Sequence, residues 1–190
     1  MLKTLRFSLH ILFQWGLVFA VLNVLFFGGI LVSAFLTSPY VPLQGDSGEW
    51  FVPPQEEFAV FFVSVFLFNF FLAAFSMVTL SGLGFFVLSA VFLGYRAFLW
   101  GLLVNQLSLF SFWAALPTIV LEGEGYVVAG VAGINLGLSW LKPSWAHKKE
   151  VSSRLEAFKM ALKECGYLYI LVAMLLFAAA IVETATIYLL

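Results

Sequence analysis

Residues 58–80 read FAVFFVSVFLFNFFLAAFSMVTL and contain no charged side chain. A helix of this length is about 35 Å long at 1.5 Å per residue, which exceeds the roughly 30 Å hydrocarbon core of a bilayer. The stretch therefore predicts a membrane-spanning helix. Comparable apolar runs occur at about Ile11–Phe35, Phe85–Val104 and Gly166–Leu189, and a less regular one at Ala114–Trp140.

The composition of the whole chain also indicates a membrane protein. Of its 190 residues, 63% are hydrophobic and 10% are charged, whereas a soluble domain is about half apolar and about a quarter charged. The mean hydropathy is +1.07. These values exclude a soluble globular protein and a disordered chain, and nine Lys and Arg residues are too few for a nucleic-acid-binding surface. We expect an all-α polytopic membrane protein that forms a single domain over residues 1–190, surrounded by the lipid bilayer.

The positions of the charges predict how the chain crosses the membrane. Lys3 and Arg6 precede the first span, residues 37–57 form an acidic, Pro-rich segment without Lys or Arg, and residues 142–164 are basic. Basic segments favour the cytoplasmic side. About five crossings of the cell membrane then place the N-terminus and the basic segment in the cytoplasm, and the acidic loop and the C-terminus outside. This count requires residues 105–140 to form one crossing that is broken or carries a re-entrant half-helix.

The basic segment has the pattern of an amphipathic helix. Apolar residues recur with helical spacing at Val151, Leu155, Phe158 and Leu162. Ser153 and Glu156 have the spacing of a capping box at a helix start. We expect a cytoplasmic helix over residues 142–164 that lies at the interface and is attracted by anionic lipids. A docking site for a partner protein is the alternative.

Four ionisable residues fall within the predicted spans, where a charge costs several kcal/mol unless it is paired or lines a wet cavity. They are Arg96, Glu122, Glu124 and Glu183. We expect Arg96 to be the counter-ion in one buried polar cluster with Glu122 and Glu183. The glycines that follow Glu122 and Glu124 predict a break in the helix, which is tolerated where it lines a cavity. The cluster is either a structural ion pair that fixes helix register or a site for a proton, a cation or a substrate.

Small and amide side chains predict how the helices pack. Gly130, Gly133 and Gly137 form a small-residue face that allows another helix to approach closely. Asn69 and Asn135 are placed to form hydrogen bonds between helices. We interpret these residues as packing contacts, with a permeation path as the alternative.

The sequence contains no pattern typical of an enzyme or a metal site. Its one cysteine, Cys165, and its two isolated histidines do not supply the clustered ligands that zinc requires. Nucleotide-binding and nucleophile motifs are also absent from the sequence. We therefore predict no catalytic residues, no metal and no cofactor.

The order of motifs resembles the stage II sporulation protein M family over about residues 58–190. The resemblance rests on residues 116–122 (LPTIVLE) and on the pairs Ala129-Gly130, Ala132-Gly133 and Leu136-Gly137 that follow. Asn69 ahead of the glycines at 82 and 84, and Ile181-Val182-Glu183 in the last span, are similar to the family's pattern as well. The chain differs from the family at Arg96 and at Gly123-Glu124-Gly125.

This resemblance implies a function as an integral membrane scaffold. Sporulating members of the family work with peptidoglycan hydrolases during engulfment. It implies that Glu122 and Glu183 are characteristic acids without a catalytic role, and that the partners are other membrane or envelope proteins. The glycine-rich face and the Phe-rich second span favour a homo-oligomer as well. The alternative function is that of a transporter or channel component with an intramembrane carboxylate site.

Overall fold

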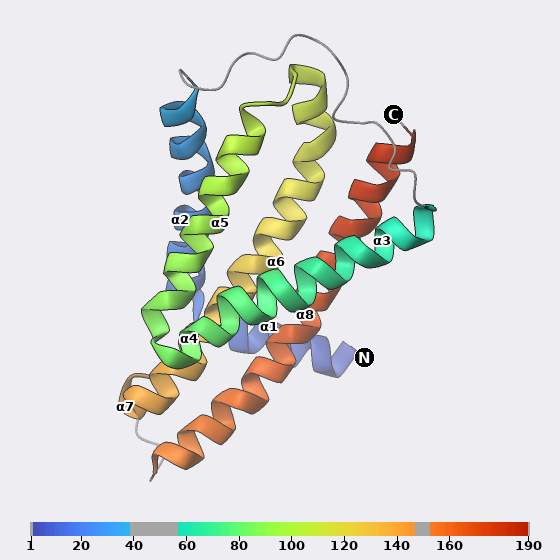
Figure 1. Cartoon of the computed structure of the whole chain (residues 1–190). Helices are drawn as coiled ribbons and strands as arrows, with labels where there is room; N and C mark the ends of the chain where they lie inside the picture. Colours follow the sequence, from blue (N-terminus) through green and yellow to red (C-terminus); the bar gives the residue numbers. More distant parts are fainter. Residues whose placement is uncertain (1, 39–56, 147–152, 190) are drawn as a thin grey trace.

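A computed structural model describes residues 2–38, 57–146 and 153–189, which are helical apart from short turns (Figure 1). No strand occurs in this part of the chain. Five helices are long and apolar enough to cross a membrane. The prediction of an all-α polytopic protein with five crossings is confirmed.

The spans run alternately up and down the bundle (Figure 1). In chain order they are α2 (Gly16–Thr37), the continuous span of α3 (Phe58–Leu67), the π-helical segment η2 (Phe68–Leu80) and α4 (Ser81–Gly84), then α5 (Phe86–Val104), α6 (Leu109–Leu141) and α8 (Arg154–Leu189). A short helix, α7 (Pro143–Ala146), precedes α8. Helices α2, α5 and α8 finish at one end of the bundle, which we call its C-terminal end. Helices α4 and α7 lie at the opposite end, which we call its N-terminal end.

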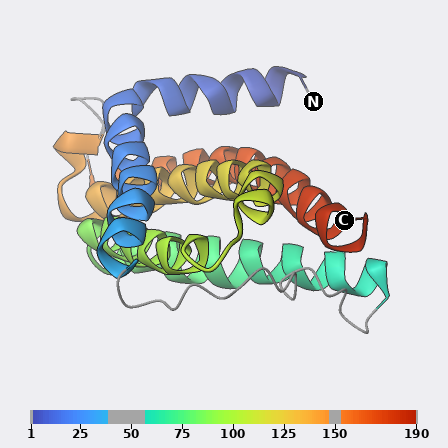
Figure 2. The same cartoon turned by 90° about the horizontal axis from the view of Figure 1, so that it is seen from above.

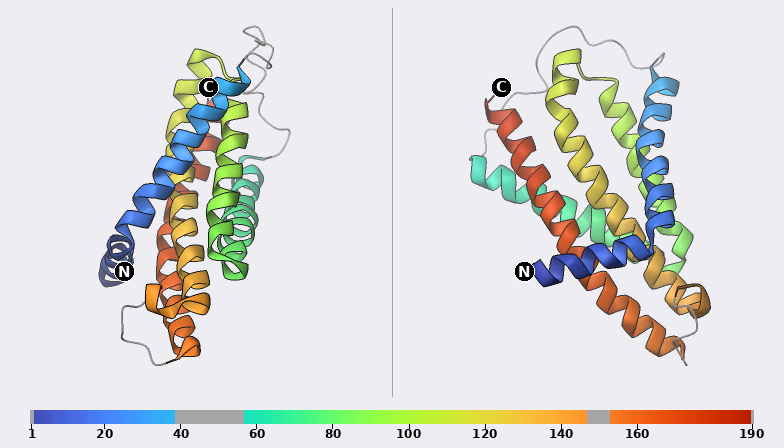
Figure 3. Two further views of the ribbon diagram at one scale, coloured as in Figure 1. Left: turned by 90° about the vertical axis from the view of Figure 1, so that its left-hand side faces the viewer. Right: turned by 180° about the vertical axis from the view of Figure 1, so that it is seen from behind.

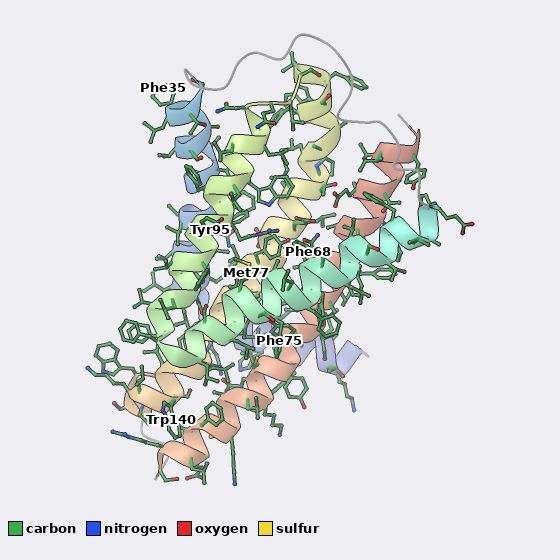
Figure 4. The ribbon with its side chains drawn as sticks, viewed as in Figure 1. Phe35, Phe68, Phe75, Met77, Tyr95 and Trp140 are labelled. Carbon is green, nitrogen blue, oxygen red and sulfur yellow. The ribbon has the colours of Figure 1, made fainter. Side chains whose placement is uncertain are left out.

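Helix α6 is the centre of the bundle. It packs against α2, α5, η2 and α8, and 83% of its most apolar window is buried, compared with 22% for α2. Seen along the bundle, α6 and α8 lie together between α1 (Leu2–Gln14) and the second span (Figure 2). The outer helices expose apolar side chains such as Phe35, Phe75 and Tyr95 (Figure 4). An apolar exterior around a buried central helix is what a bilayer environment requires.

Glycines bring the backbones of α6 and the second span into contact. A Cβ added to Gly137 would meet the carbonyl oxygen of Gly82 and, at 2.9 Å, the Cα of Phe86. A Cβ at Gly133 would meet the hydroxyl of Ser89, and one at Gly130 would lie 3.0 Å from Leu22. The small-residue face expected from the sequence is thus the face on which α4, η2 and α5 lie against α6.

The expected break in the fourth crossing is wrong, because α6 is one helix of 33 residues. The hydroxyl of Ser108 caps its start by accepting from the backbone N–H of Ser111 at 3.1 Å. The glycines instead make room for neighbouring side chains. A Cβ at Gly123 would come within 2.7 Å of two phenylalanine rings of α2, and one at Gly125 within 2.8 Å of Leu176.

The basic segment differs from the separate interfacial helix expected over residues 142–164. From Arg154 onward it is the first part of α8, a single helix of 36 residues, while residues 147–152 lie outside the described part. The cap predicted at Ser153 is confirmed, since its hydroxyl accepts from the backbone N–H of Glu156 at 3.2 Å. The alanines at 157 and 161 are fully buried, and packing against the rest of the bundle makes this segment continuous with the span. Most of the predicted acidic loop, residues 39–56, also lies outside the described part.

The N-terminal apolar run is divided into two helices at Trp15. Helix α1 (Leu2–Gln14) ends there, and α2 leaves in a different direction, so that α1 lies across α8 (Figure 3). The hydroxyl of Ser8 donates to the backbone carbonyl of Tyr167 on α8 at 2.8 Å, and Ile11 is buried. Lys3 and Arg6 are exposed. Helix α1 is therefore a surface helix on the N-terminal end, and the first crossing is α2 alone.

Gly137→Ala should destabilise the protein, because the added methyl group meets the backbone of α4 and not a flexible side chain. Overpacking of this kind costs about 1–3 kcal/mol. We expect a fall of several degrees in the apparent melting temperature of the detergent-purified protein, followed by tryptophan fluorescence. The matched control is Gly94→Ala, where a Cβ meets nothing within 4 Å. Equal melting temperatures for the two variants would contradict the close approach of α4 and α6.

Candidate functional site

A cavity of about 560 Å³ opens between α3, η2, α5, α6 and α8. Its polar lining consists of Asn69, Arg96, Glu122 and Glu183, together with Ser64. The remaining lining residues are Phe61, Val65, Phe68 and Trp100. We call this space the polar cavity. It brings together three of the four charges that the sequence places within the spans, and it lies beside the central helix α6.

The hydroxyl of Tyr126 is the centre of the hydrogen-bond network beside the cavity. It accepts from Nη2 of Arg96 at 2.6 Å, and its own proton points to Oδ1 of Asn69 at 2.8 Å or to Oε2 of Glu122 at 3.2 Å. Nδ2 of Asn69 donates to Oε1 of Glu122. The guanidinium of Arg96 also lies over the Tyr126 ring, 4.6 Å from its centroid. Arg96 thus reaches Glu122 through a tyrosine hydroxyl.

Helical spacing explains how these side chains meet. Tyr126 lies four residues after Glu122 on α6, and Trp100 lies four residues after Arg96 on α5. Residues four apart share one face of a helix. An inspection of charges alone misses Tyr126 and Trp100, because neither carries a charge. Their i+4 spacing from a buried charge is the sequence signal that identifies them.

Several polar atoms at the cavity lack a partner within the described part of the chain. Nε of Arg96, Nε1 of Trp100 and Oγ1 of Thr118 are buried without a hydrogen bond. Thr118 and Trp100 line a second cavity of about 130 Å³ that shares Glu183 with the first. Because buried polar groups are normally hydrogen-bonded, these three atoms are exceptions in residues that line two adjoining cavities.

The other polar residues predicted from the sequence lie elsewhere. The half-buried Glu124 faces α2, where its side chain interacts with Asn23. Nδ2 of Asn135 donates to Oε2 of Glu164 at 2.7 Å and thereby links α6 to α8. Glu164 lies at the end of the basic segment and is not among the residues predicted from the sequence. Among the described residues, no three acidic, histidine or cysteine side chains are grouped as a metal site would require.

The comparison with protein families identifies what kind of chain carries this cavity. The model of the stage II sporulation protein M family matches residues 22–186. The chain belongs to this family. The resemblance found in the sequence is therefore confirmed, and the stage II sporulation protein M match includes every residue that lines the polar cavity. Neither the curated proteins nor the solved structures include a match.

Tyr126→Phe should destabilise the protein although it removes a single oxygen atom. The change leaves Arg96, Asn69 and Glu122 each without one of their hydrogen-bond partners, and an unsatisfied buried polar group costs about 1–3 kcal/mol. We expect a clear fall in apparent melting temperature in detergent. Tyr95→Phe is the matched control, because it removes a hydroxyl from a half-exposed residue next to Arg96. If the two variants have the same melting temperature, the hydrogen-bond network contributes nothing to stability.

Proposed function

We propose that this member of the stage II sporulation protein M family is a membrane scaffold or assembly protein without catalytic activity. The observation that carries the proposal is the bonding of Glu122, which is only 2% exposed. Its Oε1 accepts from Asn69 on η2, and its Oε2 lies 3.2 Å from the Tyr126 hydroxyl on α6, whose single proton it shares with Asn69. Through these contacts Glu122 links α6 to η2. The charge at the centre of the bundle therefore supports a structural role.

We place the partner at the N-terminal end of the bundle, where α6 and α8 emerge as a pair. We call this surface the hairpin end, and it consists of the exposed residues Trp140, Lys142, Trp145, Leu155 and Lys159. Trp145 is 62% exposed and lies under the ammonium group of Lys142 at 4.0 Å. Tryptophan is one of the residue types enriched in binding hot spots. The excess of basic residues favours a cytoplasmic position for this end, so the partner that we propose is a membrane or envelope protein with an acidic cytoplasmic segment.

Affinity purification of the tagged full-length protein from its native membrane, in a mild detergent, tests this proposal. We expect one partner at a fixed ratio to the wild type. The double variant Trp145→Ala and Lys159→Glu should retain about one-tenth of it or less, since a hot-spot residue contributes about 2 kcal/mol or more. Both side chains are exposed, so the folded state should be unaffected.

The matched control is Phe35→Ala, which truncates a side chain that is 79% exposed at the opposite end of the bundle. This control should retain the partner in full. Recovery of a homo-oligomer with no other stoichiometric protein would contradict the scaffold proposal. Equal recovery of the partner with the double variant and with Phe35→Ala would contradict it as well.

A second candidate function, in a transporter or channel, is favoured by Glu183. This carboxylate lines both cavities and has no hydrogen-bond or ion-pair partner among the described residues. Glu183 therefore remains available to a proton or a cation, in contrast to Glu122.

Flux measurements in liposomes discriminate between the two candidate functions. A scaffold should give the same proton and sodium flux as empty liposomes, and Glu183→Gln should leave this background unchanged. A transporter should give a flux above background that Glu183→Gln removes while the protein keeps its melting temperature. The readout is a pH-sensitive dye or a sodium-sensitive dye trapped inside the vesicles.

A further inference from the structure

We propose that the polar cavity binds a zwitterion that carries an ammonium group and an oxyanion a few atoms apart, as ethanolamine phosphate does. Such a group is available as the headgroup of a phospholipid or as a free solute. The proposal stands apart from the scaffold function, because it concerns the side of the bundle between α3, α5 and α8 and not the hairpin end.

The oxyanion follows from the donors on α5. Nε of Arg96 and Nε1 of Trp100 are both buried, lack acceptors, and belong to residues that line the cavity. Each nitrogen carries a proton that it can only donate. A phosphate or carboxylate group offers several acceptor oxygens, and Arg is well suited to such a group because its guanidinium donors are held in a fixed planar arrangement.

The ammonium group follows from Glu183 on α8. The charge of Arg96 is already shared with Glu122 through the hydroxyl of Tyr126, whereas Glu183 has no donor among the described residues. A carboxylate at membrane depth needs a cation or hydrogen-bond donors. An ammonium group supplies both.

Simpler ligands satisfy only part of this site. A proton or a sodium ion would compensate Glu183 but would leave the N–H groups of Arg96 and Trp100 without acceptors. Inorganic phosphate would accept from those groups but would add negative charge next to Glu183. A zwitterion offers acceptor oxygens to the N–H groups of Arg96 and Trp100 and an ammonium group to Glu183. It adds no net charge, which matters where the dielectric constant is low.

The depth of the cavity places it within reach of the headgroup layer. Glu183 lies six residues before the end of α8, Arg96 eight residues before the end of α5, and Phe61 three residues after the start of α3. At 1.5 Å per residue these positions are about 5–12 Å from the helix ends. All three ends are at the C-terminal end of the bundle (Figure 1), so a headgroup enters the cavity without crossing the hydrocarbon core.

The size and the apolar lining also fit such a ligand. Cavities that bind small molecules measure about 300–1,000 Å³, and this one measures about 560 Å³. Phe61, Val65 and Phe68 supply an apolar wall along α3. Phe68 lies on the second span where this span passes in front of α6 (Figure 4). This wall suits the carbon atoms between the two charged groups or the first part of an acyl chain.

Native mass spectrometry of the full-length protein tests the lipid source. The protein is equilibrated in mild detergent with equal amounts of phosphatidylethanolamine, phosphatidylcholine and phosphatidylglycerol. We expect selective retention of phosphatidylethanolamine, because choline has no N–H donor for Glu183 and phosphatidylglycerol has no cation. Glu183→Gln should reduce that retention about tenfold, as expected for the loss of a charge-assisted hydrogen bond.

Two further variants make this result specific. Trp100→Phe keeps an aromatic ring and removes the unpartnered N–H group, so it should also weaken retention. Glu124→Gln makes the same chemical change as Glu183→Gln in an acid outside the cavity, and it should retain the lipid like the wild type. The melting temperature of each variant confirms that it is folded. If Glu183→Gln does not fold, Trp100→Phe still tests the cavity.

The free source is tested with glycerophosphoethanolamine, a phosphodiester that carries no net charge, added to delipidated protein. A rise in melting temperature for the wild type but not for Glu183→Gln or Trp100→Phe, without lipid selectivity, supports a soluble zwitterion as the ligand. The proposal is overturned if neither probe binds selectively, or if both cavity variants respond as Glu124→Gln does. A missing partner at the hairpin end would overturn the scaffold function and leave this result unchanged.

Discussion

The bonding of Glu122 is the constraint on which the rest of the structure depends. A carboxylate in the middle of a bundle surrounded by hydrocarbon has no water to solvate it, so the protein must supply every partner. Asn69 donates to one oxygen of Glu122, the Tyr126 hydroxyl lies beside the other, and Arg96 adds a positive charge one hydroxyl group away. These partners come from three different segments, η2, α5 and α6. The position of one charge therefore fixes how the second, third and fourth crossings meet.

Close packing of α6 makes this arrangement possible. The glycines at 133 and 137 bring its backbone against the segment around Gly82. At that distance short polar side chains reach across, and the hydroxyl of Thr79 donates to the carbonyl oxygen of Ala129 at 2.9 Å. Without a hydrophobic driving force between helices inside a bilayer, such contacts and hydrogen bonds hold the bundle together. The polar network is thus one part of a packed interface that extends along α6.

The spans could be predicted from the sequence because hydrocarbon selects long runs such as residues 58–80 without reference to tertiary contacts. Two local readings failed for a common reason. The glycines at 123 and 125 look like helix breakers until the side chains that occupy their space are known, and the basic residues after Arg154 look like a separate helix until their packing is known. Tertiary packing determines both, and a single sequence does not contain it.

The charged residues of the candidate site could be predicted from the sequence, but the residues that form hydrogen bonds with them could not. Arg96, Glu122 and Glu183 were recognisable because any charge within an apolar span is conspicuous. Glu124 meets the same criterion, yet it faces Asn23 on α2. Only spatial proximity shows that Tyr126 mediates between Arg96 and Glu122, since a buried tyrosine in an apolar helix is common. Unpartnered atoms such as Nε1 of Trp100 are likewise a property of the folded structure.

The continuity of α8 has a mechanical consequence. This helix has 36 residues, and the 29 residue steps from Arg154 to Glu183 correspond to about 44 Å, more than the thickness of the hydrocarbon core. No hinge divides it, so it acts as a stiff lever across the bilayer. A tilt imposed on its basic start at one membrane surface displaces the wall of the polar cavity near the other surface. The basic start and Glu183 are thus joined by one continuous helix, although they lie toward opposite ends of the bundle.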